Sequence, residues 1–283
     1  MKLINLRGRA SVLVDSGAID VHAATGGAFG PDTASCLADW DRFVKAVTES
    51  ESTTKPEPFD ERDLGAPVPE PRQIFAIGLN YADHARETGL SSPEYPVVFT
   101  KFVTSLSGPV TTVTLPSANV DYEAELVVVM GQTAHNVDPT DAWDYVAGMT
   151  VGQDLSEREV QTRGGASAQW SLGKSLPGFS PVGPALVTID EIEDRDDLAI
   201  GCRVGDEILQ SSRTSELIFT VPELVSYLSR ILPLLPGDLI FTGTPAGVGI
   251  GRDPKRYLRA GETLTTEISG LGRLETTFRA QPK

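Results

Sequence analysis

The first 50 residues alternate between short apolar runs and turn signals. Residues 3–23 contain β-prone runs, and Asp15-Ser16-Gly17 separates Ser11–Val14 from Ile19–His22. This pattern predicts a β-hairpin. Apolar residues then recur at helical spacing over residues 37–47, which predicts a helix with one buried face.

A polar, proline-rich stretch follows at residues 50–72 and is typical of a linker or an extended strap. We place a domain boundary near its end. The expected organisation is a small α+β domain with its linker over residues 1–70 and a catalytic domain over residues 71–283.

The second region is rich in short strands. The pattern predicts a strand at Ile74–Ile77, a helix at Tyr81–Thr88 that ends at Gly89, and a strand at Val97–Phe102. A later helix begins at Pro222, with five apolar residues expected to face the core: Leu224, Val225, Leu228, Ile231 and Leu232. Strands and helices do not alternate regularly, which argues against a TIM barrel or a doubly wound sheet. We expect a β-rich α+β fold.

One strand carries two carboxylates on one face. Val120–Gly131 has an apolar second half, and strand alternation places Glu123 and Glu125 on the same side. Two carboxylates next to a buried segment are costly unless they are paired with a positive charge. A divalent cation would offset that cost, and hard oxygen ligands suit Mg²⁺, Mn²⁺ or Ca²⁺. The alternative is a half-exposed strand with two ordinary surface acids.

Composition and charge narrow the class of protein. The 283 residues carry a net charge of −15, which argues against nucleic-acid and anionic-membrane partners. Two distant cysteines, Cys36 and Cys202, form neither a disulfide framework nor a thiolate metal site. The absence of a long apolar run or an apolar leader favours a cytoplasmic enzyme.

A histidine and a glutamate occur three residues apart in the predicted helix at residues 81–88. His84 and Glu87 would be neighbours there, and a carboxylate beside an imidazole fixes its tautomer and raises its basicity. The loop from Glu87 to Tyr95 could close as a lid that sets substrate selectivity. The alternative is a charged pair on an exposed helix.

Three further stretches carry polar residues suited to an anionic ligand. Asp154, Arg158 and Gln161 would share one face if a helix begins at Asp154, although an amphipathic surface helix would show the same pattern. Lys174 lies among apolar and small residues, where a partly desolvated lysine could neutralise an enolate, or it is an ordinary loop lysine. Residues 242–251 form a glycine-rich turn whose backbone N–H groups and Thr244 could face an anion.

Taken together, these stretches resemble the fumarylacetoacetate hydrolase family, and its smaller acylpyruvase-like branch in particular. The resemblance covers Ile74 to Phe278 and follows the family's order through five motifs: Gly78-Leu79-Asn80-Tyr81 with His84, Asp121-Tyr122-Glu123-Ala124-Glu125, Asp154-Leu155-Ser156-Glu157-Arg158 with Gln161, Gly173-Lys174-Ser175, and Gly237–Pro245. It implies a mixed β-sheet roll and a homodimer.

The resemblance also implies roles for individual residues. Three groups result: Glu123, Glu125 and Asp154 as ligands of Mg²⁺ (or Mn²⁺ or Ca²⁺); His84, Glu87 and Lys174 as catalytic residues; and Arg158, Gln161 and Thr244 as substrate-binding residues. Some larger members add a further aspartate ligand, which the region near Gly78 lacks, so we expect three protein carboxylates and waters.

The function that the resemblance implies is hydrolysis of a C–C bond in a small 2-oxo acid, of the acylpyruvate or fumarylpyruvate type, through a metal-stabilised enolate. The alternatives are decarboxylation of oxaloacetate and hydration or isomerisation of 2-hydroxy-dienoic diacids in aromatic catabolism. Two rivals from other classes are a non-catalytic metal-binding protein and a nucleotide-binding enzyme that uses the Gly243–Gly251 loop. A thermal-shift assay with ATP would reveal the second.

Overall fold

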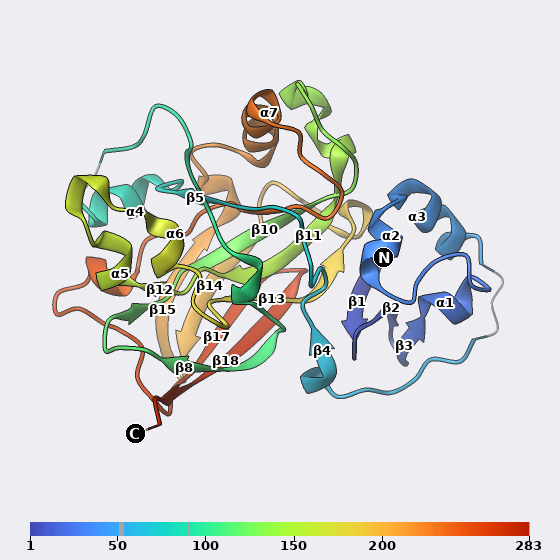
Figure 1. Cartoon of the computed structure of the whole chain (residues 1–283), viewed down its shortest axis with the longest axis horizontal. Helices are drawn as coiled ribbons and strands as arrows, with labels where there is room; N and C mark the ends of the chain where they lie inside the picture. Colours follow the sequence, from blue (N-terminus) through green and yellow to red (C-terminus); the bar gives the residue numbers. More distant parts are fainter. Residues whose placement is uncertain (51–53, 90, 283) are drawn as a thin grey trace.

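A computed structural model describes residues 1–50, 54–89 and 91–282. Residues 51–53 of the expected linker and residue 90 of the expected lid therefore lie outside the described part. The described chain forms a mixed, β-rich α+β fold with two large sheets, as the sequence predicts (Figure 1). Among the described helices, none is both long and apolar enough to cross a bilayer.

The larger sheet has eleven strands in the order β3-β2-β1-β13-β11-β10-β16-β5-β6, with β4 beside β1 and β7 beside β13. Its strands have these bounds: β1 Lys2–Leu6, β2 Arg9–Val14, β3 Gly17–Asp20, β4 Leu64–Gly65, β5 Ile74–Gly78, β6 Val97–Thr100, β7 Leu106–Ser107, β10 Ala124–Met130, β11 Val146–Gln153, β13 Ser180–Val187 and β16 Leu239–Phe241.

A second sheet has five strands in the order β15-β14-β17-β18-β8, and a small ribbon pairs β9 with β12. Their bounds are β8 Val110–Leu115, β9 Val120–Asp121, β12 Ser156–Glu157, β14 Ala199–Val204, β15 Glu207–Arg213, β17 Thr263–Ile268 and β18 Gly272–Ala280. The α-helices are α1 Val21–Ala24, α2 Thr33–Leu37, α3 Trp40–Thr48, α4 Ala82–Glu87, α5 Arg158–Thr162, α6 Trp170–Gly173 and α7 Val221–Ile231.

The first 50 residues form the group of elements drawn in blue at the right of Figure 1. The predicted hairpin is confirmed, because β2 and β3 pair with Leu13 opposite Ala18, but β3 ends at Asp20 and His22 lies in α1. The first strand, β1, pairs with β13 in the large sheet. The two regions thus share a sheet, and the domain boundary near residue 70 stays a prediction.

Strand β10 lies at the centre of the large sheet and is buried on both faces. Leu126, Val128 and Met130 belong to the core shared with the five-stranded sheet and α7, whereas Val127 and Val129 belong to the core under α2 and α3. An unbroken apolar run is what a strand covered on both sides requires. This packing fixes the backbone that carries Glu125.

Two predicted helices differ in detail from the structure. The late helix is present as α7, with a capping box between Thr220 and Glu223, but Ile231 is 63% exposed and does not face the core. The helix expected from Asp154 begins only at Arg158, because residues 156–157 pair as β12 with β9. Asp154 lies between two strands instead.

Candidate active site and metal centre

The three carboxylates singled out in the sequence come together. Each of Glu123, Glu125 and Asp154 offers an oxygen within 4.8 Å of the others, and all three side chains are buried. Glu125 lies on β10, Glu123 lies just before it, and Asp154 follows β11, the neighbour of β10. The backbone N–H of Asp154 donates to the carbonyl of Glu123 at 2.9 Å, which continues the pairing and sets the three carboxylates side by side.

The charges of this cluster make it suited to a divalent cation. Burial, together with the charges of Asp154 and Glu123, raises the pKa of Glu125 well above its ordinary value. Burial also opposes ionisation of Glu123, but Lys174 and Arg158 outweigh it and lower the pKa of Glu123. Three hard oxygen donors around one point fit Mg²⁺, Mn²⁺ or Ca²⁺, and a cation among them would relieve the repulsion that Glu125 experiences.

Lys174 lies against the cluster at the C-terminal end of α6. Its ammonium donates to Glu123 Oε2 at 2.6 Å, Asp154 Oδ2 at 2.5 Å and Ser156 Oγ at 2.9 Å, and the residue is 2% exposed. A Cβ at Gly173 would lie 2.5 Å from the backbone nitrogen of Gln161, so glycine there lets α6 pack on α5 and brings Lys174 inward.

A second lysine, Lys101, was not predicted as part of the site. It follows β6, is 3% exposed, and donates to Asp154 Oδ1 and to the carbonyl of Lys174. Burial lowers its pKa, partly offset by Asp154. The signal was in the sequence, because strand alternation from Phe99 places Lys101 on the same inward face.

The histidine–glutamate pair is formed on α4. His84 Nδ1 and Glu87 Oε1 are 2.8 Å apart, and His84 is 7% exposed. The other oxygen of Glu87 accepts a hydrogen bond from the backbone N–H of Gly247 at 2.8 Å. If Nδ1 donates to Glu87, Nε2 keeps its lone pair, which is the arrangement that a general base needs.

Arg158 and Gln161 lie on the first turn of α5 and point to the same place. Arg158 Nη1 donates to Gln161 Oε1 at 2.8 Å, and Nη2 lies 2.7 Å from Glu123 Oε1. Both side chains are 7% exposed. Thr244 lies close by but uses its hydroxyl within the protein, donating to the carbonyl of Ala124 and accepting from Gln210.

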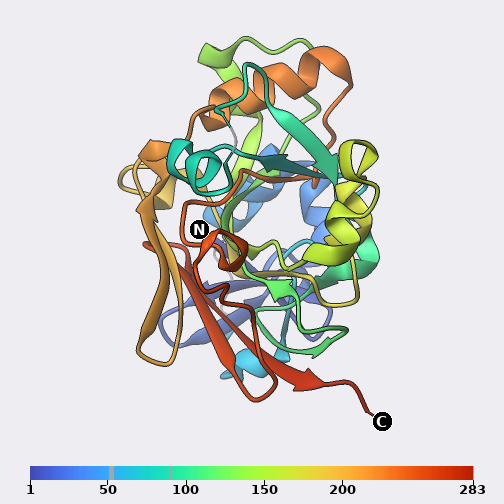
Figure 2. The same cartoon turned by 90° about the vertical axis from the view of Figure 1, so that its left-hand side faces the viewer.

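Most of these residues line one pocket of about 230 Å³, with Glu87, Lys101 and Asp154 behind them, and an apolar wall of the pocket includes Ile77, Phe99, Trp170 and Ile250. Figure 2 shows α4 (teal) on one side of the molecule and α5 and α6 (yellow-green) on the other. All nine residues predicted for the site lie in or beside this pocket: His84, Glu87, Glu123, Glu125, Asp154, Arg158, Gln161, Lys174 and Thr244.

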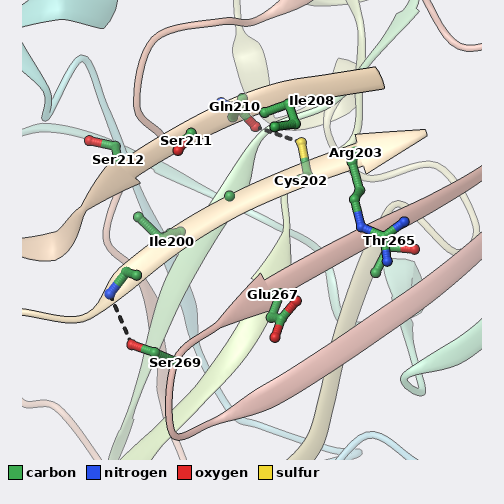
Figure 3. Close-up of a pocket in the computed structure, with 12 residues that line it drawn as sticks. Ile200, Cys202, Arg203, Ile208, Gln210, Ser211, Ser212, Thr265, Glu267 and Ser269 are labelled. Atoms are coloured by element: carbon green, nitrogen blue, oxygen red, sulfur yellow. Dashed lines mark hydrogen bonds between the residues drawn. The ribbon is translucent and has the colours of Figure 1, made fainter. Parts of the chain in front are cut away.

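A different hollow lies over β14, β15 and β17 and is drawn in Figure 3. Ile200, Cys202 and Ile208 contribute to it, and Cys202 Sγ lies 3.2 Å from Gln210 Oε1. Its residues include one carboxylate, Glu267, and no histidine. Gln210 connects this hollow with the candidate site, because it lines the hollow and its amide also donates to Thr244 Oγ1 at 2.8 Å.

Comparison with known proteins identifies the family. Residues 73–279 match the profile described as fumarylacetoacetate (FAA) hydrolase C-terminal. The chain therefore belongs to the fumarylacetoacetate hydrolase family.

Individual relatives add detail. The chain is 44% identical over 209 residues to the oxaloacetate tautomerase Fahd2a, mitochondrial, of Rattus norvegicus, an alignment that covers 73% of this chain and 66% of the rat protein. A solved structure from Mycobacterium smegmatis, provisionally assigned as an HpcE protein, superposes with a TM-score of 0.95 at 50% identity and full coverage of both chains.

A maleylpyruvate hydrolase from Sphingobium sp. SYK-6, solved with manganese(II) and pyruvate, has a TM-score of 0.82 at 27% identity, with full coverage of both chains. These comparisons support the family and the fold that the sequence predicted. The reactions named for the relatives differ from one another.

Proposed function

We propose that this protein is a divalent-metal-dependent enzyme that acts on a small 2-oxo acid by breaking a bond at C3, the carbon next to its keto group. The observation that carries the proposal is the convergence of Glu123, Glu125 and Asp154 within 4.8 Å, in the pocket that also holds His84. Bound there, Mg²⁺ or Mn²⁺ would act as a Lewis acid on the keto and carboxylate oxygens of the substrate.

The chain's own residues supply the remaining functions. Arg158 and Gln161 bind and orient the substrate carboxylate, since a guanidinium suits that group geometrically. Phe99, Trp170 and Ile250 exclude water from one side of the pocket. Lys174 keeps positive charge beside Glu123 and Asp154, and His84, oriented by Glu87, takes up or delivers a proton from Nε2.

The first candidate reaction is hydrolysis of the C–C bond of an acylpyruvate or fumarylpyruvate. His84 would take a proton from water as the water attacks the distal carbonyl, and the proton would then be delivered to C3 as the bond breaks. The fold shared with a maleylpyruvate hydrolase supports this candidate.

The second candidate is tautomerisation of oxaloacetate, favoured by 44% identity to the rat tautomerase. This reaction moves one proton from C3 to the keto oxygen, so it needs His84 but no attacking water. Decarboxylation of oxaloacetate, and hydration or isomerisation of 2-hydroxy-dienoic diacids, remain alternatives that the same site would support.

The experiment that tests the proposal is an activity screen of the purified protein against acylpyruvates, fumarylpyruvate, oxaloacetate and 2-hydroxy-dienoic diacids, with and without EDTA. At least one of these compounds should be turned over, and EDTA should abolish the activity until Mg²⁺ or Mn²⁺ is restored. Undiminished turnover in EDTA, or inactivity towards all of them, would contradict the proposal.

A histidine variant separates the reactions. His84→Ala should lower acylpyruvate hydrolysis by about 10²–10⁴-fold, the range for loss of a general base. Metal-dependent decarboxylation of oxaloacetate should stay within a few-fold, because loss of CO₂ needs no water activation. Equal loss of both activities, at unchanged metal affinity and stability, would count against this division of roles.

The family resemblance also leads us to propose a homodimer. The cellular compartment of the protein stays a prediction. The sequence favours the cytoplasm, whereas the rat relative is named as mitochondrial.

A further inference from the structure

The glycine-rich turn at residues 243–251 binds anions, but these anions belong to the protein itself. The backbone N–H of Gly243 donates to Glu125 at 2.8 Å, that of Gly247 to Glu87 at 2.8 Å, and those of Gly249 and Ile250 to Asp121 at 2.7 and 2.9 Å. One loop is therefore bonded to a proposed metal ligand, to the partner of His84 and to a third carboxylate with no role so far.

That third carboxylate, Asp121, is fully buried at the end of β9, two residues before Glu123. Its Oδ1 accepts from the backbone N–H groups of Tyr122 and Gly249. Its Oδ2 accepts from Ile250 N–H and from Arg158 Nε at 2.8 Å, and lies 2.8 Å from Arg158 Nη2. The single oxygen Oδ2 thus contacts both the loop, at Ile250, and the guanidinium of Arg158.

The loop approaches Asp121 closely because residue 249 is glycine. A Cβ there would lie 2.7 Å from Asp121 Oδ1 and 2.0 Å from the carbonyl of Arg256. Ile250, the next residue, lines the same pocket as Arg158. The carboxylate therefore connects two parts of the pocket that belong to different elements.

Arg158 depends on this contact for its orientation. Its guanidinium is buried, and burying a charge is costly unless it is paired. Asp121 accepts a hydrogen bond from Nε and lies 2.8 Å from Nη2, Glu123 lies 2.7 Å from Nη2, and Gln161 accepts from Nη1. Among these partners Glu123 is a proposed metal ligand and Gln161 a proposed substrate ligand, which leaves Asp121 as the partner with no task towards metal or substrate.

We propose that Asp121 is a positioning residue: it fixes the guanidinium of Arg158 against the 249–250 loop so that Arg158 meets the substrate carboxylate. The inference rests on the proposed function for what Arg158 binds. Asp121 does not line the pocket, so it would act on the substrate only through Arg158.

The test is Asp121→Asn, which keeps the size and one acceptor oxygen but sets an amide NH₂ against two of the donors that now face a carboxylate. KM for the 2-oxo acid found in the activity screen should rise about ten- to hundredfold, as expected when a charge-assisted hydrogen bond that orients a ligand is lost. The kcat should change by less than about threefold, and Mn²⁺ affinity should be unchanged, because a substrate-orienting contact acts on binding.

A double-mutant cycle separates positioning from a general structural effect. In an Arg158→Gln background, Asp121→Asn should add less than about twofold to the increase in KM, because the residue it positions is absent. The matched control is Asp138→Asn, an exposed aspartate that also accepts backbone and hydroxyl hydrogen bonds. It should leave KM at the wild-type value.

Two outcomes would overturn the inference: wild-type KM in Asp121→Asn, or full additivity with Arg158→Gln. If Asp121→Asn unfolds, Asp121→Glu, which keeps the charge but displaces it, takes its place with the same expectation. Failure of the proposed function gives a different result, because the wild-type protein itself would then turn over none of the 2-oxo acids.

Discussion

At the scale of single residues, the site joins three carboxylates to three buried cations. Lys101, Lys174 and Arg158 are each at most 7% exposed and each contacts Asp154 or Glu123. Such a cluster is stable only as a set, because removing one partner leaves a buried charge unpaired. Lys101 tests this, since it contacts Asp154 but is not among the residues that line the pocket.

Lys101→Met should reduce the free energy of unfolding by about 3 kcal/mol, the lower end of the cost of breaking a buried ion pair. Added Mn²⁺ should restore more stability to this variant than to the wild type, because a cation at the carboxylates replaces the missing charge. Urea denaturation with and without Mn²⁺ measures both effects.

The control for this prediction is Lys45→Met on α3, an exposed position that should change stability by less than about 0.5 kcal/mol. If Lys101→Met and Lys45→Met had the same stability and the same response to Mn²⁺, Lys101 would have no part in the charge balance of the site.

Local spacing singled out these candidate residues, and the family resemblance supplied their roles. The Glu123-x-Glu125 spacing on an apolar strand and the i,i+3 spacing of His84 and Glu87 depend only on the geometry of one element. Asp121 belongs to the motif Asp121–Glu125, but local spacing indicates no role for it, since its partners Gly249 and Ile250 lie 128 and 129 residues away. Contacts of that kind follow from the fold.

At the scale of elements, both strands and short helices form the walls of the pocket: Ile77, Phe99 and Glu125 come from strands, and His84, Arg158, Gln161 and Trp170 from helices. Trp170 on α6 packs against β5 and β6: its ring lies 5.6 Å from that of Phe99 on β6, and a Cβ at Gly78 on β5 would lie 2.5 Å from the indole. Gly78 therefore allows α6 to lie close to the sheet. The position of α6 matters because Lys174 follows at its C-terminal end.

Gly78→Ala should displace Trp170, reduce stability by about 1–3 kcal/mol through overpacking, and lower kcat/KM. Gly78→Ala combined with Trp170→Phe should regain part of the stability, since a smaller ring makes room for the methyl group. Thermal unfolding and steady-state kinetics measure these changes. If Gly78→Ala matched the wild type in both, α6 would not depend on this contact.

The elements also show where pattern reasoning failed. The expected helix from Asp154 correctly grouped Asp154 with Arg158 and Gln161, but the cause is different. Arg158 and Gln161 lie on α5, whereas strand pairing holds Asp154 beside Glu123. Helical spacing and a strand-to-helix junction both bring residues four to seven apart into one pocket. The sequence alone could not separate them.

At the scale of the whole molecule, the pairing between distant strands was not predictable. β1 pairs with β13 although about 180 residues separate them, and no local pattern specifies such a partner. The fold class followed from the lack of regular βα alternation, and the family resemblance supplied the sheet roll.

We propose a contact face for the homodimer on the described surface. Five large apolar side chains are exposed on β6, its flanks and the adjacent α6: Tyr95, Val98, Phe102, Val103 and Leu172. Thr100 on β6 contacts Ser171 on α6, so the two elements lie together. Each chain has a net charge of −15, so two copies repel each other, and an uncharged contact face such as this adds no like-charge contacts to that repulsion.

Light scattering after size exclusion should give twice the 30.2 kDa chain mass for the wild type. Leu172→Glu should shift the protein towards monomer, because it buries a charge in the contact. Ile231→Glu on α7 is the matched control, because Ile231 is 63% exposed and Leu172 61%, and it should stay dimeric. A monomeric wild type, or an unaffected Leu172→Glu variant, would contradict this assignment.

Above all, we propose that Glu123, Glu125 and Asp154 bind one divalent cation per chain. Calorimetric titration of metal-free protein with Mn²⁺ tests it most directly, with Glu125→Gln as the variant and Asp138→Asn as the control. The account predicts one ion per chain for the wild type and the control, and an affinity at least tenfold weaker for Glu125→Gln, since losing a ligand should cost no less than losing a residue that supports one. Equal Mn²⁺ affinity in the wild type and Glu125→Gln would contradict the account.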